Sequence, residues 1–421
     1  MSSNSLDQTI SGIADRIAVV FRTNAKDETA EFYTKIEVAP DINECSGEVG
    51  TVYRKDSGGS RPIVDIYKFE YRNTLVERFE KRNLFVKATL LLVALPGSTL
   101  RVLRALFSRS SGKTRAEIFQ LLYALAILSS LVIYVGILLL AVWKSAAELG
   151  VGIPDPTLAT QWFYGRLPWW LPNWDLGKVS QRLVILSAAF ALLLPSGITL
   201  KTLISQAAVN SLSLIYYLNL GEGRTSIFGR LEVLIDDILK KMELERRNGN
   251  RAGYRNVSVM AYSFGSIIAL DSFFPNGRDP ARPFQRVHSL ITIGCPFDFV
   301  RTMWRDYFDA RRRFASGCPA RWLNVYSPED VLGSNFRDTP EVGDPNINIQ
   351  GAANDDPSDV PLPQRNIVYT QGLDHSRLSW LDSFTLIGLR SHGMYWGSGP
   401  PETNCFNELV PHMWDGDSVL K

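Results

Sequence analysis

The pattern of apolar and polar positions predicts short strands and helices in both end regions of the chain. Runs of β-branched and aromatic residues at 16–22, 31–38 and 62–69 predict three strands near the N-terminus. Residues 228–244 place apolar side chains at helical spacing with charges opposite, which predicts an amphipathic helix. A second helix is expected over 265–273. Four more strands are expected at 256–261, 287–293, 322–326 and 366–370.

This alternation predicts one α/β domain built from two separated parts of the chain. Strands that alternate with helices typically form a mainly parallel, doubly wound sheet. The N-terminal strands alone would make a poor domain, so we expect them to join the C-terminal sheet. The domain would then comprise residues 1–83 and 226–421, with residues 84–225 inserted between them.

Two long apolar runs in the inserted region predict transmembrane helices at about 118–143 and 183–203. The first run has no charged residue, and about 20 apolar residues are enough to cross a bilayer. The second contains Pro195, which membrane helices tolerate better than soluble ones. Trp and Tyr residues are concentrated between the runs, at 159–175. Such a segment is typical of an aromatic belt at a membrane surface, although an apolar loop packed on itself is an alternative.

Basic residues favour one orientation of this membrane hairpin. Lys and Arg are more frequent just before the first run than in the segment between the two runs. The positive-inside rule therefore favours both soluble flanks in the cytoplasm. Residues 1–16 lack a basic segment followed by an apolar one, so we expect no cleaved secretory signal. We expect an integral protein of an inner or plasma membrane, with the lipid bilayer as a partner.

Composition excludes several function classes. The 421 residues include 45 Lys plus Arg and 43 Asp plus Glu, a net charge of +2, which argues against a nucleic-acid partner. The four cysteines lie far apart, so we expect neither a disulfide framework nor a zinc site. No P-loop, dinucleotide-binding glycine fingerprint or HExxH motif occurs, and we expect no cofactor or metal. Only four histidines are available as a catalytic base.

A serine with small neighbours lies between a predicted strand and a predicted helix. Ser263 has Ala261 two positions before it and Gly265 two positions after, the G-x-S-x-G pattern with alanine in the first small position. Such a turn forces the serine into a strained conformation that exposes its Oγ. The following helix directs its N-terminus, with the N–H of Phe264, at a developing oxyanion. The alternative is that Ser263 is an ordinary turn serine.

At this turn the chain resembles the α/β-hydrolase superfamily of serine hydrolases. The resemblance implies a triad in the chain order serine, acid, histidine, with the acid after the second strand beyond the nucleophile. Asp330 occupies that place, in an Asp-Val-Leu-Gly segment that resembles the family's acid turn. Glu329 and Asp298 are lesser candidates for the acid.

The resemblance implies that the base follows the last strand. His392 begins an H-x-x-Y-W segment similar to one in lipase-like members, which also have a G-x-P turn such as the one at 294–296. His375 follows the last predicted strand more closely and is the runner-up. His288 precedes the acid and His412 lies near the end of the chain, so we expect structural roles for both.

The chain departs from the family at the second oxyanion donor. Many relatives follow an early strand with His-Gly, whereas the run at 16–22 is followed here by Thr23 and Asn24. Thr23 or Asn24 then provides this donor, or the oxyanion hole is incomplete.

The leading hypothesis is a membrane-anchored serine hydrolase that cleaves an ester, thioester or lipid acyl bond through an acyl-enzyme. The alternative is a catalytically inactive α/β-hydrolase-like module, tethered to the membrane for binding or signalling, which the missing His-Gly favours. A third possibility is a channel or effector gated by the soluble domain. The sequence specifies neither the acyl substrate nor the oligomeric state.

Overall fold

The structure is a computed structural model that describes residues 10–25, 30–38, 45–82, 213–221, 223–248, 254–276, 278–304, 307–308, 319, 321–327, 330, 332–336, 363–369, 392–396, 404–413 and isolated positions between 86 and 104. The chain divides into two compact units. The first consists of Met1–Tyr71, Arg109–Leu121 and Gly223–Lys421, and the second of Arg72–Ser108 and Leu122–Glu222. The first unit contains the candidate site.

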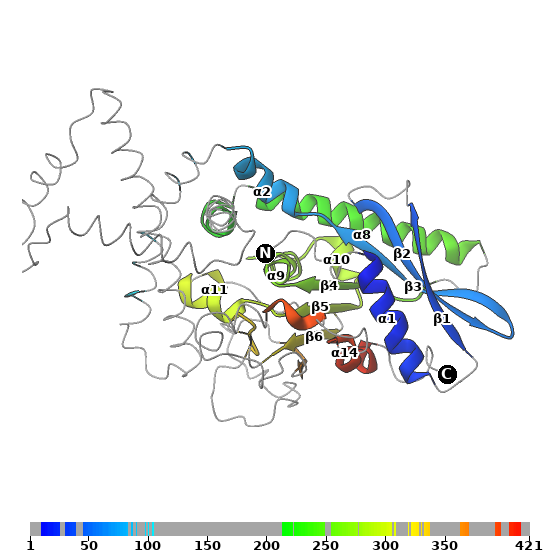
Figure 1. The fold of residues 1–421 in the computed structure, drawn as a ribbon. Helices are drawn as coiled ribbons and strands as arrows, with labels where there is room; N and C mark the ends of the chain where they lie inside the picture. Colours follow the sequence, from blue (N-terminus) through cyan, green and yellow to red (C-terminus); the bar gives the residue numbers. More distant parts are fainter. Residues whose placement is uncertain are drawn as a thin grey trace, which may run out of the picture. The chain divides into compact units, whose positions relative to one another are not determined.

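The first unit has mixed α/β character, with two sheets and the helices that cover them (Figure 1). Its described elements, in chain order, are α1 (Ile10–Asn24), β1 (Glu31–Val38), β2 (Cys45–Asp56), β3 (Gly59–Phe69), α8 (Arg224–Arg247), β4 (Ser258–Tyr262), α9 (Phe264–Phe273), α10 (Arg282–Gln285), β5 (Ser289–Ile293), α11 (Phe297–Met303), β6 (Arg321–Tyr326), β7 (Arg365–Val368), η6 (Met394–Trp396) and α14 (Phe406–Met413).

The N-terminal elements form an antiparallel sheet of order β1-β2-β3 against which α1 packs. Gly50 of β2 lies under the start of the helix, since a Cβ atom at this position would be 2.5 Å from Cγ2 of Ile10. Glycine therefore allows the close approach of helix and strand. Phe21 of α1 stacks on Phe32 of β1, with ring centroids 5.8 Å apart.

The C-terminal strands form a fully parallel sheet of order β4-β5-β6-β7. Side chains alternate between its two faces, as the pleat requires. Ile291, Ile293, Leu323 and Val325 join a buried cluster with residues of α1, β1, β2 and α14. On the opposite face Trp322 packs against Phe274, which directly follows α9. The sheet is thus covered on both faces, as parallel sheets generally are.

The second unit is described over two short helices. These are α2 (Arg72–Glu80) and the π-helical turn η2 (Tyr216–Leu220). The ring of Phe79 packs edge-on against Tyr216, with centroids 5.7 Å apart, and the Ser213 hydroxyl donates to the carbonyl of Leu75 at 3.2 Å. The predicted transmembrane runs, 118–143 and 183–203, and the aromatic segment between them lie outside the described residues. Over the part that the structure does describe, no helix is long and apolar enough to cross a membrane.

Most of the predicted elements are confirmed, but the first predicted strand is wrong. Residues 16–22 belong to α1, whose buried side chains Ile10, Ala14, Ile17 and Phe21 follow helical spacing. The short run of apolar residues concealed this period because the helix begins six residues earlier, in a more polar segment. The first sheet also contains β2, which is absent from the elements expected from the sequence.

One prediction about the sheets also needs correction. The N-terminal strands do not join the C-terminal sheet among the described strands, but pair with one another. The four described C-terminal strands form a parallel sheet, as expected, and the doubly wound arrangement stays a prediction. β2 escaped prediction because glycine and charged residues outnumber the β-branched and aromatic residues in its sequence.

Candidate active site

Ser263 occupies a strained turn between β4 and α9. Its backbone has φ 53° and ψ −127°, a conformation that costs a non-glycine residue about 1–3 kcal/mol. The turn is fixed on both sides: the Ser263 N–H donates to Ile293 of the neighbouring strand at 2.9 Å, and its carbonyl accepts from Ser266 at 2.9 Å. The buried Ala261 fits at the close of β4 because its side chain is small. The Ser263 side chain is thereby presented at the N-terminus of α9.

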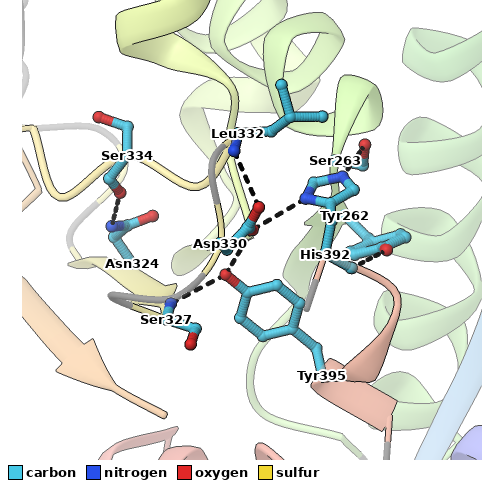
Figure 2. Close-up of polar contacts among 9 residues, drawn as sticks. All are labelled: Tyr262, Ser263, Asn324, Ser327, Asp330, Leu332, Ser334, His392 and Tyr395. Carbon is cyan, nitrogen blue, oxygen red and sulfur yellow. Dashed lines mark hydrogen bonds and ion pairs between the residues drawn. The ribbon is translucent and has the colours of Figure 1, made fainter. Parts of the chain in front are cut away.

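Ser263, His392 and Asp330 form one hydrogen-bonded chain (Figure 2). His392 Nε2 lies 2.6 Å from Ser263 Oγ, and His392 Nδ1 lies 2.8 Å from Asp330 Oδ2. A carboxylate can only accept, so Nδ1 carries the proton and donates it to Asp330. The second nitrogen, Nε2, is then free to accept the hydroxyl proton of Ser263. This tautomer is the one in which the imidazole can act as a base toward the serine.

Burial differs sharply along this chain of three residues. His392 is fully buried and Asp330 is 4% exposed, whereas Ser263 is only partly buried. The imidazole and the carboxylate are therefore shielded from water, where their mutual attraction is strongest. Ser263 is thus the partly exposed end of this chain of hydrogen bonds.

Tyr262 holds the imidazole from the strand side. Its ring stacks on His392 at a centroid distance of 5.4 Å and an interplanar angle of 24°, and its hydroxyl donates to the His392 carbonyl oxygen. Burial, followed by the charge of Asp330, raises the pKa of Tyr262, so the hydroxyl stays protonated and remains a donor. The residue that precedes the serine thus fixes both the ring and the backbone of His392.

A buried polar ladder fixes the loop that follows the acid. Thr292, Asn324 and Asn366 lie side by side on adjacent strands and are fully buried. Thr292 Oγ1 lies 2.8 Å from Asn324 Oδ1, and Asn324 Nδ2 donates to Asn366 Oδ1 at 2.8 Å. The two amides also donate to loop carbonyls, Asn324 to Ser334 at 2.8 Å and Asn366 to Asn335 at 2.7 Å. The sheet thereby anchors the backbone just beyond Asp330.

The N-terminal helix anchors the turn that contains the histidine. Arg16 of α1 is 9% exposed and its guanidinium donates to the carbonyls of Trp396 and Gly12. Trp396 ends η6, the short helix that follows His392. A hydrogen bond from a charged donor to a carbonyl oxygen is stronger than one from a neutral donor. α1 therefore ties the C-terminal histidine turn to the core of the first unit.

The structure brings Ser263, Asp330 and His392 together, but it excludes the role expected for Thr23. Thr23 lies in the last turn of α1, and its hydroxyl donates to the Val19 carbonyl at 3.0 Å. The strand-to-loop transition on which that expectation relied does not exist, because this segment is a helix. Asn24 likewise donates to the Val20 carbonyl at 2.9 Å. Phe264, the expected first donor, is the first residue of α9.

The other candidates from the sequence lie elsewhere. Asp298 accepts a hydrogen bond from the Ser334 hydroxyl and so supports the acid loop rather than the histidine. His288 precedes β5 and His412 lies in α14, and burial lowers the pKa of both imidazoles. Glu329 and His375 lie outside the described residues.

The described thiols do not compete with Ser263 as nucleophiles. Cys295 and Cys405 are free and fully buried, and burial raises the pKa of both thiols, that of Cys405 to about 12. A thiol is nucleophilic only as the thiolate. Within the described ranges, no three His, Cys, Asp or Glu residues are grouped so that they could hold a metal ion.

The tyrosines around the triad were not assigned a role from the sequence. Tyr395 was visible as part of the H-x-x-Y-W segment, but its hydroxyl contact with Asp330 depends on the packing of η6 against the acid loop.

Comparison with protein-family models, with curated proteins and with solved structures finds no match to this chain.

Proposed function

We propose that this protein is a serine hydrolase of the α/β-hydrolase type that cleaves an ester, thioester or lipid acyl bond. The observation that carries the proposal is the continuous chain of hydrogen bonds from Ser263 through His392 to Asp330. A nucleophile within hydrogen-bond distance of a base, itself oriented by an acid, is the arrangement that activates a serine. The strained backbone of Ser263, directly before a helix, gives further support.

The reaction would proceed in two balanced steps. Ser263 Oγ attacks the acyl carbon while its proton passes to His392 Nε2. The bond to the leaving group then breaks, and His392 returns the proton to the departing alcohol or thiol. Water attacks the resulting acyl-serine, and the same imidazole first takes its proton and then delivers it to Ser263 Oγ. Asp330 stabilises the imidazolium in both steps.

The N-terminus of α9 would stabilise the developing oxyanion through its dipole and through the first main-chain N–H of the helix. The N-terminus of α9 begins directly after Ser263, and the helix dipole is positive there. In this proposal the main-chain N–H of Phe264 is one donor, as the fold type requires of the residue after the nucleophile. Tyr71, which follows β3, lies beside this first helical turn, with its hydroxyl 3.6 Å from where a Cβ on Gly265 would be.

We further propose that the enzyme is anchored in an inner or plasma membrane by helices at about 118–143 and 183–203. The support is the absence of charged residues from the first run and their scarcity in the second. A site held beside a bilayer suits an acyl substrate of low solubility.

A topology reporter tests the orientation of the anchor. The predicted hairpin crosses the membrane twice, so both flanks lie on one side, and the positive-inside rule favours the cytoplasm for them. A reporter fused after Lys421 is therefore expected to be active on the cytoplasmic side. The same reporter inserted near residue 160, between the two predicted helices, is the matched control and should report the opposite side. A signal from outside the cytoplasm after Lys421 would contradict the proposed topology.

The proposed chemistry is tested by titrating activity with a covalent probe. Full-length protein in detergent should hydrolyse p-nitrophenyl butyrate, and a fluorophosphonate should abolish this activity in step with its incorporation, ending at one probe per chain. Only a serine activated by a base reacts with such a probe at a useful rate. If the folded protein neither hydrolyses the ester nor incorporates the probe, the inactive binding-module hypothesis would replace this one.

A further inference from the structure

We propose that Tyr395 is a positioning residue that holds Asp330 in place and shares the charge of its carboxylate. The proposal deepens the hydrolase function and rests on it. Tyr395 is fully buried, and its hydroxyl donates to Asp330 Oδ2 at 2.8 Å (Figure 2). The same oxygen accepts from His392 Nδ1. One carboxylate oxygen therefore serves the tyrosine and the histidine together.

The direction of the tyrosine bond follows from its second partner. The N–H of Ser327 points at the Tyr395 hydroxyl, with the nitrogen 2.9 Å from the oxygen. Because this amide can only donate, the hydroxyl accepts from it and must direct its own hydrogen at Asp330. Burial and the neighbouring carboxylate both raise the pKa of Tyr395, so the group remains a donor at every working pH. Bonds arranged in sequence in this way polarise and strengthen one another.

Two glycines form the walls of the slot that contains Tyr395 and Asp330. A Cβ on Gly294, which has φ 54°, would be 2.7 Å from Cε2 of the Tyr395 ring. A Cβ on Gly333 would be 2.6 Å from Asp330 Oδ2 and 2.9 Å from the Tyr395 hydroxyl. Any larger residue at either position would displace the pair. The space that Tyr395 and Asp330 need thus explains why glycine occupies position 294, directly after β5, and position 333, three residues after the acid.

Among the described residues, no other side chain besides His392 donates a hydrogen bond to the Asp330 carboxylate, so none could replace the hydroxyl of Tyr395. Asp330 Oδ1 accepts the main-chain N–H of Leu332 at 2.9 Å, and Oδ2 accepts only from His392 and Tyr395 in the bonds that the structure shows. Without the hydroxyl, rotation of the carboxylate about its Cβ–Cγ bond would be opposed only by Leu332 and by His392 itself. Tyr395 therefore fixes the position of the acid independently of the base that the acid must orient.

The test replaces the hydroxyl and keeps the ring. In full-length protein, Tyr395→Phe should reduce kcat for p-nitrophenyl butyrate by about 10-fold, because the Asp330 carboxylate is then held less firmly in the position from which it orients His392. KM should change little, because the tyrosine does not contact substrate. The acid limb of the pH–rate profile should move to higher pH, because Oδ2 then directs its full charge at the imidazolium. Tyr369→Phe is the matched control: its buried ring lies 6.0 Å from Tyr395, and its profile should equal that of the wild type.

Active sites are counted by fluorophosphonate titration, so that a loss of folded protein is not mistaken for a loss of rate. An unchanged kcat per titrated site with an unchanged acid limb would overturn the inference while leaving the hydrolase function in place. A wild type that neither reacts nor hydrolyses would overturn both. If Tyr395→Phe does not fold, difluorotyrosine at position 395 keeps the shape and donates more strongly. The acid limb should then move to lower pH, and an unmoved limb would again contradict the proposal.

Discussion

Replacement of Ser263 with alanine is expected to reduce the hydrolysis of p-nitrophenyl butyrate by about 10⁴- to 10⁶-fold, to the level that binding and the oxyanion donors alone support. The reason is that Ser263 Oγ forms the bond to the acyl carbon, and no other described nucleophile lies within hydrogen-bond distance of His392 Nε2. The measurement is kcat/KM of purified full-length protein in detergent. Thermal unfolding should show a folded protein that is less stable by about 1 kcal/mol, because the buried His392 loses its hydrogen bond with the serine.

Ser272→Ala provides the matched control for this prediction. Ser272 lies in the same helix, α9, is buried, and its hydroxyl donates to the Ile268 carbonyl at 2.9 Å. Its loss should cost about 1 kcal/mol of unfolding free energy and leave the rate per folded molecule unchanged. Hydrolysis that survives Ser263→Ala, or that disappears equally in both variants, would remove Ser263 from the mechanism.

His392→Ala should have an effect of similar size, about 10⁴-fold or more, whereas His375→Ala should leave kcat/KM within about threefold of the wild type. The imidazole of His392 joins the serine to the acid, so its removal leaves Ser263 without a base and leaves Asp330 buried beside a cavity. Steady-state kinetics of the two variants measure this difference.

The comparison is informative because effects within a catalytic unit do not add. The double variant Ser263→Ala/His392→Ala should be no slower than either single variant. A large loss in His375→Ala with a near-normal His392→Ala would assign the base to His375 instead.

The sequence was most informative where local pattern and tertiary structure agree. The helix over 228–244 is confirmed because its buried side chains, such as Leu231, Leu234 and Ile235, follow the helical spacing that the sequence shows. The strand at 31–38 is confirmed as well. Prediction failed for α1 because its central apolar run is compatible with either element, and only the more polar residues before it reveal the helical period. It failed for β2 because this strand contains more glycine and charged residues than β-branched and aromatic ones.

The candidate site divides in the same way. The serine turn was recognisable because its chemistry requires small residues at fixed spacing, and the order of acid and base follows from the resemblance. Thr23 could not be placed correctly, because that expectation depended on a strand where the chain forms a helix. The residues that support the triad could not be predicted from the sequence. Tyr262, Tyr395 and the Asn324–Asn366 pair act through contacts between residues that lie 42 to 130 positions apart in the chain. Such contacts leave no local signal.

The central claim is that Ser263 is an activated nucleophile. Its most direct test is to label full-length protein in detergent with a fluorophosphonate, digest it, and locate the adduct by mass spectrometry. We predict one adduct per chain, on the peptide that contains Ser263, and none in Ser263→Ala or His392→Ala. An adduct on another residue, or none on folded wild-type protein, would contradict the assignment of this chain as a serine hydrolase.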